Sequence, residues 1–130
     1  MLLDTSGLYC LLHGQEREHG RACDAYREAP TRLTHGYVLA ELIALANARG
    51  LPQAPVLAFV RDLLANPDID TVWADEFLTS RAIGLLVARV DQGYTLADAL
   101  SFVLMRDRGI RDALTTDHHF RREGLEALLS

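Results

Sequence analysis

Four acidic residues lie far apart along the chain, each beside the end of an expected strand or the start of an expected helix. Asp4 and Asp117 follow short apolar segments, and Glu41 and Asp98 stand early in segments with helical periodicity. Functional groups of parallel α/β sheets gather at the carboxyl ends of the strands, so these side chains could meet in one place. Four carboxylates that meet would raise one another's pKa unless a cation neutralises them. The sequence therefore predicts a divalent-metal site.

The ligand types narrow the choice of ion and of reaction. Carboxylate oxygens without cysteine, and without a required histidine, favour a hard ion, Mg²⁺ or alternatively Mn²⁺. Such an ion lowers the pKa of a water, orients it and screens the charge that develops on a phosphate, so the site suits hydrolysis of a phosphodiester. The formal net charge is −5, and without the four acids it would be −1. The surplus negative charge is therefore expected largely in the predicted site.

Each acid also has a plain structural interpretation, which the sequence leaves open. Asp4 and Asp117 could cap helices or close Asx turns where strands end. Thr95 and Asp98 have the spacing of a capping box. Glu41 fits such a role worst, because it lies beside the apolar stripe of its helix and has no basic residue at the spacing of a helical partner. A carboxylate in that position must be paired, protonated or bound to a metal.

Strands and helices are expected to alternate along the chain. Apolar runs and turn residues predict strands over residues 1–4, 32–35, 69–74, 112–116 and 125–129. Helical periodicity and stop signals predict helices over residues 7–13, 16–29, 37–49, 54–65, 76–91 and 95–108. Strands separated by helices of this length indicate a parallel sheet that is covered on both faces.

The composition excludes several classes of protein. All thirteen basic residues are arginine, so the chain lacks the lysine that a P-loop places on phosphates. Haloacid-dehalogenase-type phosphatases and response-regulator receivers, which also open with an aspartate after the first strand, use a lysine as well. The phosphatases further need a second aspartate where this chain has Ser6. No GxGxxG motif is present, which argues against a dinucleotide site.

Length and hydropathy fit one domain that spans residues 1–130. Of the 130 residues, 49% are hydrophobic and 24% charged, enough to bury a core. No apolar stretch is long enough to cross a membrane, and no basic segment precedes an apolar one at the beginning of the chain. The cysteines, Cys10 and Cys23, form no zinc or redox motif. We therefore expect a cytoplasmic protein.

The segments that carry the four acids resemble the PIN domain family, and most closely its VapC-type toxin ribonucleases. They are LDTS at residues 3–6, VLAEL at 38–42, LADALSFVLM at 96–105 and ALTTDHHF at 113–120. Each segment alone is a weak signal, but their order and spacing over nearly the whole chain are fairly specific. The resemblance implies a three-layer α/β/α sandwich with a central, mostly parallel sheet. It also implies metal-dependent cleavage of single-stranded RNA.

The resemblance assigns expected roles to individual residues. Asp4 and Asp98 match the family's firmest metal ligands, and Glu41 and Asp117 match the other two acids, which complete the site or hold its waters. Two hydroxyl residues match positions that orient these carboxylates, namely Ser6 and Thr115.

The resemblance also implies partners. VapC-type toxins are usually homodimers, and a cognate antitoxin inserts a peptide over the site and often places an arginine among the acids. A housekeeping PIN nuclease without a toxin role, or a PIN module that binds RNA or protein without turnover, stays open as an alternative.

Basic residues near the predicted site are candidates for RNA contacts. Arg121 and Arg122 follow the last acid and could clamp phosphates, although they could equally be solvated surface residues. His35 stands where the family often has serine or threonine, and His118 and His119 follow Asp117. These histidines could bind RNA phosphates or a softer ion, but we expect them to be partly exposed loop residues.

Overall fold

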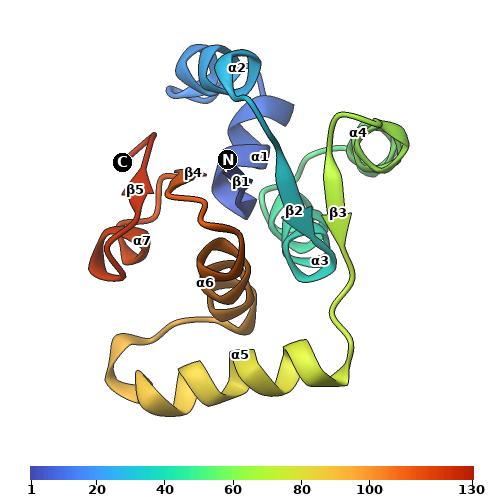
Figure 1. Cartoon of the computed structure of the whole chain (residues 1–130). Helices are drawn as coiled ribbons and strands as arrows, with labels where there is room; N and C mark the ends of the chain where they lie inside the picture. The colour runs from blue at the N-terminus through green and yellow to red at the C-terminus, as the bar shows by residue number, and fades with distance from the viewer.

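The computed structural model describes residues 1–130 and contains a five-stranded, fully parallel sheet with the order β3-β2-β1-β4-β5 (Figure 1). The strands are short: β1 (Leu2–Leu3), β2 (Leu33–His35), β3 (Asp70–Val72), β4 (Asp112–Leu114) and β5 (Glu126–Ala127). This arrangement confirms the parallel sheet that the sequence predicts. The strand nearest the beginning of the chain, β1, lies at the centre of the sheet.

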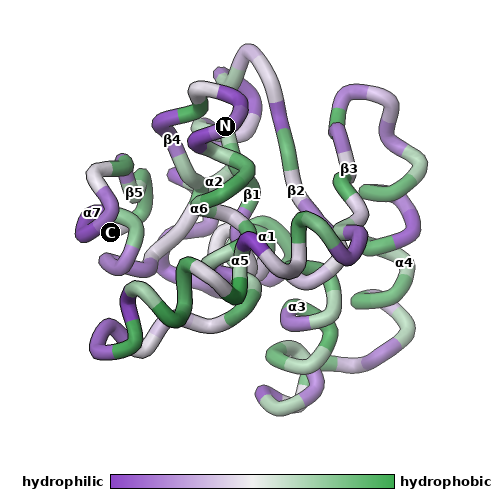
Figure 2. Tube along the Cα trace, turned by 60° about the horizontal axis from the view of Figure 1, so that its bottom comes forward, coloured by the Kyte–Doolittle hydropathy of each residue, from purple (hydrophilic) through white to green (hydrophobic).

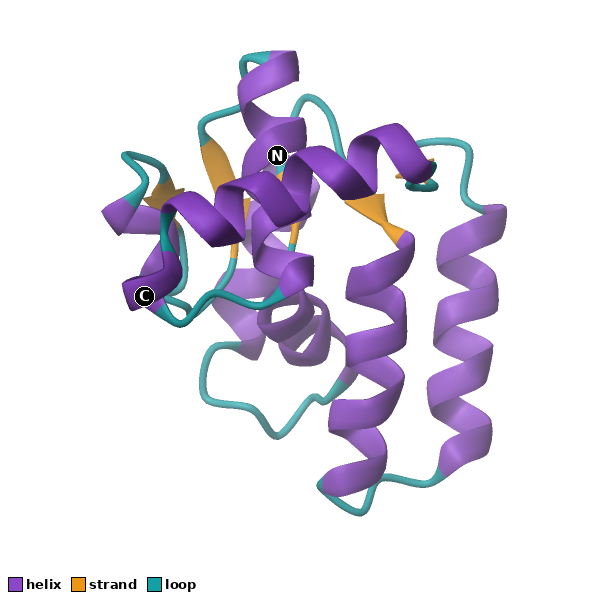
Figure 3. Cartoon of the chain, turned by 90° about the horizontal axis from the view of Figure 1, so that it is seen from below, coloured by secondary structure: helices purple, strands orange, loops and turns teal.

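Seven α-helices and one 3-10 turn connect the strands. They are α1 (Thr5–Leu12), α2 (His19–Glu28), α3 (Gly36–Ala48), α4 (Gln53–Ala65), α5 (Glu76–Ala88), η1 (Val90–Gln92), α6 (Leu96–Arg108) and α7 (His119–Arg122). α5 packs across α6 (Figure 1), and α3 and α4 lie side by side as an antiparallel pair (Figure 3). None of the helices is long and apolar enough to cross a membrane.

The buried apolar side chains form two clusters, one on each face of the sheet. Successive residues of a strand point to opposite faces. Leu3 and Leu114 accordingly join a cluster with α1, α2, α3 and α4, while Leu2 and Ala113 join a cluster with α5, α6 and α7. Two helical layers with a sheet between them make the three-layer α/β/α sandwich that was expected.

The sheet register brings the ends of β1 and β4 together. Leu3 is paired with Leu114, so the residues that follow them, Asp4 and Thr115, leave the sheet side by side. The backbone N–H of Asp4 donates to the Leu114 carbonyl at 3.2 Å. Helix α1 starts directly after Asp4 and passes close to β4, which is possible because Gly7 has no side chain. A Cβ at residue 7 would stand 1.9 Å from the Leu114 carbonyl oxygen.

All predicted strands and helices exist, with bounds that differ by a few residues, and the structure departs from the prediction in three places. The helix predicted over 76–91 ends at Ala88 and continues as η1. The prediction for the last segments missed α7, whose four residues are too few to show helical periodicity. Only Glu126–Ala127 of the strand predicted over 125–129 pairs with β4.

Replacing Gly7 with alanine should destabilise the protein by about 1–3 kcal/mol or more, because the new methyl group forces α1 away from β4. The matched control is Gly84→Ala in α5, where nothing lies within 4 Å of the added carbon. That change should leave stability unchanged or raise it by up to about 1 kcal/mol through helix propensity. Urea unfolding of the two variants measures the difference. Equal effects at the two positions would contradict the close approach of α1 to β4.

Candidate metal centre

The structure brings the four predicted acids together at the carboxyl edge of the sheet. Asp4 follows β1 and Asp117 follows β4, while Glu41 lies in the second turn of α3 and Asp98 in the first turn of α6. Neighbouring acids raise pKa values within the group: Asp98 acts on Asp4 and Glu41, Glu41 acts on Asp4, and Asp117 acts on Glu41 and Asp98. Since α3 and α6 lie on opposite faces of the sheet, the group collects side chains from both helical layers.

A chain of hydroxyl groups fixes the Asp4 carboxylate. Asp4 occupies the N-cap position of α1, but its side chain makes no capping hydrogen bond. Instead, Thr115 Oγ1 donates to Asp4 Oδ2 at 2.7 Å. Thr115 has one proton to give, so Ser6 Oγ must donate to Thr115 Oγ1 at 3.0 Å, and Ser6 in turn accepts the Thr116 N–H. Thr115 therefore contacts the Asp4 carboxylate directly, whereas Ser6 acts on it only through the hydrogen bond to Thr115.

Asp98 caps its helix and faces the acidic group at the same time. Its Oδ2 accepts the Thr95 N–H at 3.1 Å, and Thr95 Oγ1 accepts the Asp98 N–H at 3.1 Å, which confirms the predicted capping box. Because the capping bond holds one face of the carboxylate, the side chain points to the same place whatever else binds there. Asp98 can therefore cap α6 and still serve as a metal ligand.

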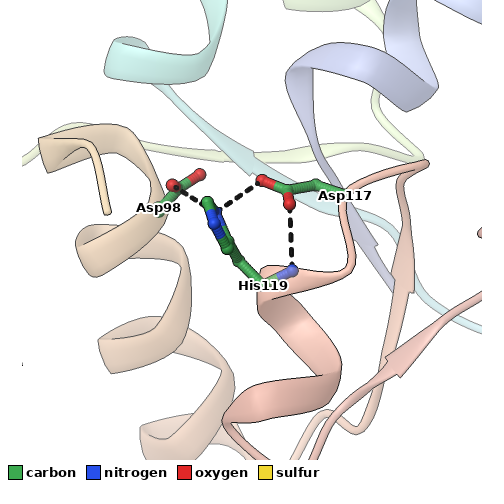
Figure 4. A group of neighbouring side chains, drawn as sticks. All are labelled: Asp98, Asp117 and His119. Carbon is green, nitrogen blue, oxygen red and sulfur yellow. Dashed lines mark hydrogen bonds and ion pairs between the residues drawn. The ribbon is translucent and has the colours of Figure 1, made fainter. Parts of the chain in front are cut away.

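Asp117 closes an Asx turn with His119 at the start of α7 (Figure 4). Asp117 Oδ1 accepts the His119 N–H at 2.9 Å, and the Asp117 N–H donates to Thr115 Oγ1 at 3.0 Å. The His119 ring turns back toward the acids, with Nδ1 3.2 Å from Asp117 Oδ2 and 3.7 Å from Asp98 Oδ2. The ligand atoms of these three residues all lie within 4.8 Å of one another.

Burial and mutual repulsion raise the pKa of three of the four acids, Asp4, Glu41 and Asp98. Burial is the main cause that raises the pKa of Asp4 to about 7, and the charges of Asp98 and Glu41 add to it, while the Thr115 hydrogen bond opposes it. Burial also raises the pKa of Glu41 and of Asp98, again with contributions from neighbouring acids. Burial is therefore the first cause of each shift, and the charges of neighbouring acids add to it.

The protein itself supplies little positive charge to the group. None of the ion pairs in the structure joins an arginine to Asp4, Glu41, Asp98 or Asp117. Within the group, His119 Nδ1 is buried and has no hydrogen-bond partner. Four carboxylates and an imidazole nitrogen that makes no hydrogen bond are a donor set that fits a divalent cation.

The two predicted RNA-contact arginines lie in α7, the short helix that begins with His119. Arg121 donates to the Ser130 carbonyl at 2.9 Å, and Arg122 donates to Gln92 Oε1 at 3.2 Å. Arg122 also lies 3.3 Å from His118 Nε2. Both residues are exposed, and neither is paired with an aspartate or a glutamate, so their guanidinium groups are accessible to a phosphate. Their role in RNA binding remains a prediction.

The expectation that all three histidines are partly exposed loop residues is wrong for His35. Its side chain is fully buried at the end of β2. His35 Nδ1 accepts the Val38 N–H at 3.3 Å, and Nε2 lies 2.9 Å from Ser101 Oγ. Burial lowers the pKa of His35 to about 4, so the imidazole is neutral and Nε2 carries the proton that Ser101 accepts. The bridge joins α3 to α6 beneath the acids, and nothing in the local sequence marks Ser101 as its partner.

His119 lies in this centre, although the sequence analysis named it only as an alternative ligand for a softer ion and not among the four predicted ligands. A signal for it exists in the sequence, because an Asx turn brings the residue two positions after an aspartate back toward the carboxylate. His118, by contrast, is exposed as expected.

Divalent-metal affinity should rise with pH up to about 7 and then level off. The pKa of Asp4 is raised from its ordinary 3.8 to about 7, so the carboxyl stabilises the metal-free fold at low pH and loses that contribution as pH rises through about 7. A cation that needs the ionised form must displace this proton, which lowers affinity by up to about tenfold per pH unit below 7. Titration calorimetry with Mn²⁺ at several pH values measures the trend. Asp4→Asn should bind more weakly and with a weaker pH dependence, which Glu41 and Asp98 still cause. A flat profile for the unmodified protein would contradict the raised pKa.

Comparison with known proteins gives a consistent result. The family model described as PIN domain matches residues 1–124. The protein named 23S rRNA-specific endonuclease VapC20, from two strains of Mycobacterium tuberculosis, is 31% identical over 125 residues, which are 95% of this chain and 94% of the relative. The crystal structure of Mycobacterium tuberculosis VapC20, a Sarcin-Ricin loop cleaving toxin by its description, superimposes with a TM-score of 0.86 at 26% identity and covers 96% of this chain and 95% of the other. The chain belongs to the PIN domain family.

Proposed function

We propose that this protein is a metal-dependent endoribonuclease and the toxin of a type II toxin–antitoxin pair. The observation that carries the proposal is the meeting of four carboxylates, with no arginine paired to them, at the edge of the sheet where α/β proteins place their chemistry. Similarity to VapC20 over nearly its whole length, together with that protein's name, supports RNA as the substrate and toxin as the role.

Some residues of the site would bind the metal ion, and others would keep these ligands in position. Asp4 and Asp98 would bind Mg²⁺ or Mn²⁺, with Glu41 and Asp117 completing the site. When bound, a divalent ion supplies Lewis-acid activation of water and neutralises charge at the phosphodiester. Thr115 holds the Asp4 carboxylate at 2.7 Å, so that the geometry exists before the ion arrives. Glu41, without a basic partner, is free to accept a proton or a ligand.

The exposed arginines next to the acids would bind the RNA backbone. Arg121 and Arg122 lie in α7, the helical turn that begins with His119. A guanidinium makes paired hydrogen bonds to phosphate oxygens, which offsets the repulsion between RNA and an acidic centre. These contacts would set position along the backbone and carry no base specificity.

For the substrate, we propose unpaired RNA, either a single strand or the loop of a folded RNA. VapC20 is described as cleaving the Sarcin-Ricin loop and is named for 23S rRNA. Proteins recognise RNA sequence mainly in loops and single strands, where bases are free of the duplex. An RNA substrate of this kind would place the protein's action in the cytoplasm.

We further propose a cognate antitoxin and a homodimer as partners. Apolar residues recur along α4 and α5 (Figure 2), and several are well exposed: Leu57, Leu64, Phe77, Ile83 and Val87. Exposed apolar side chains at helical spacing suit an interface with another helix. An arginine contributed by an antitoxin would have four unpaired carboxylates to bind.

A cleavage assay tests the proposed activity. The protein should cut an unstructured RNA or a Sarcin–Ricin loop oligonucleotide with Mg²⁺ or Mn²⁺, leave duplex RNA intact, and stop when a chelator is added. Asp98→Asn should lower the rate by at least about 100-fold, because the loss of outer-shell partners alone costs about 10- to 100-fold. The asparagine oxygen can still accept the Thr95 N–H, so the capping box and the fold should survive.

The control for that variant is Asp62→Asn, which removes one negative charge from an exposed position on α4. Its rate should equal that of the unmodified protein. Equal cleavage by Asp98→Asn would contradict the assigned site. Normal metal binding without cleavage of any RNA would favour the non-catalytic alternative.

A further inference from the structure

We propose that His119 is itself a metal ligand, so that the centre binds its ion through one imidazole nitrogen as well as carboxylate oxygens. The inference rests on the proposed function only in that a divalent ion occupies this place. It adds a ligand of a different chemical type to the four acids, and it predicts which ions the protein prefers.

The distances between the three side chains suit a shared ion (Figure 4). His119 Nδ1 lies 3.2 Å from Asp117 Oδ2 and 3.7 Å from Asp98 Oδ2, and all three ligand atoms fall within 4.8 Å. With bonds of about 2.1 Å, neighbouring ligands of an octahedral ion are ~3.0 Å apart and opposite ligands ~4.2 Å. Small inward movements of the side chains would therefore complete the coordination.

The only neighbours of this nitrogen among charged groups are the two carboxylates, which lie at ion-pair distance. Nδ1 is buried and makes no hydrogen bond, even though two carboxylate oxygens are near, because neither oxygen is aligned for one. The nitrogen therefore faces the gap between Asp98 and Asp117 (Figure 4). Two carboxylates beside a buried ring nitrogen favour positive charge between them, which a proton on Nδ1 or a bound cation supplies.

Contacts with the backbone and with Tyr94 also hold the His119 ring in this orientation. The His119 backbone N–H is bonded to Asp117 Oδ1, which fixes the start of α7 against the acid. The Tyr94 ring meets the imidazole edge-on, with centroids 5.2 Å apart and an angle of 66°. Tyr94 itself packs against Phe102 of the core at 5.0 Å. A ligand that is positioned before the ion arrives loses little side-chain freedom on binding.

An imidazole ligand changes the order of preference among ions. Magnesium binds almost only to oxygen, whereas first-row transition ions bind imidazole well. His119 should therefore favour Mn²⁺ over Mg²⁺ relative to a site of carboxylates alone. Replacing it with alanine should weaken Mn²⁺ binding by about tenfold or more, and Mg²⁺ binding by less.

Pulsed electron paramagnetic resonance of bound Mn²⁺ tests the proposal without relying on activity. Protein grown with ¹⁵N-labelled histidine and loaded with Mn²⁺ should show electron spin echo modulation from one directly bound ¹⁵N nucleus. His119→Ala should lose this modulation, and His118→Ala should keep it, because His118 is exposed and its Nε2 lies against Arg122.

The spectrum of the unmodified protein alone decides whether a histidine binds the ion, even if a variant fails to fold. Bound Mn²⁺ without nitrogen modulation would overturn the ligand role of His119 and leave the proposed ribonuclease intact. If modulation persists in His119→Ala, another histidine is the ligand and the proposal is wrong. Failure of Mn²⁺ to bind at all would overturn both this proposal and the metal dependence of the proposed function.

Discussion

Repulsion among four carboxylates in a partly buried place is the constraint on which the rest of this structure depends. Hydrogen bonds stabilise the ionised carboxylates against this repulsion. The Thr115 hydroxyl donates to Asp4, and the backbone N–H groups of Thr95 and His119 donate to Asp98 and Asp117. Each bond favours the ionised form, yet burial still raises the pKa of Asp4 to about 7. The hydrogen bonds orient the acids but do not neutralise their negative charge. A divalent cation bound among them would neutralise it.

The fold gathers these side chains from both helical layers. Adjacent parallel strands β1 and β4 deliver Asp4 and Asp117, while α3 and α6, from opposite faces, deliver Glu41 and Asp98. The buried His35 bridges α3 and α6 through the Val38 N–H and the Ser101 hydroxyl. A neutral imidazole, which offers one donor and one acceptor, fixes the spacing of the two helices without adding charge near the acids.

The sequence predicted the sheet, nearly all the helices and the convergence of the acids, because hydrophobic periodicity and strand ends are local signals. The Asp98 capping box was predictable for the same reason. The His35–Ser101 bridge was not, since it depends on how two distant elements pack. Helix α7 could not be predicted, because four residues are too few to show helical periodicity. The approach of His119 to Asp98 depends on α7, so it could not be predicted either.

Location of a bound ion by anomalous scattering from a Mn²⁺-soaked crystal tests the central claim most directly. The account predicts one strong peak at the carboxyl edge of the sheet, about 2.0–2.4 Å from oxygen atoms of Asp4 and Asp98. A peak found only on surface acids elsewhere would contradict it. The same holds if no ion binds and the four carboxylates instead sit protonated or paired with arginines.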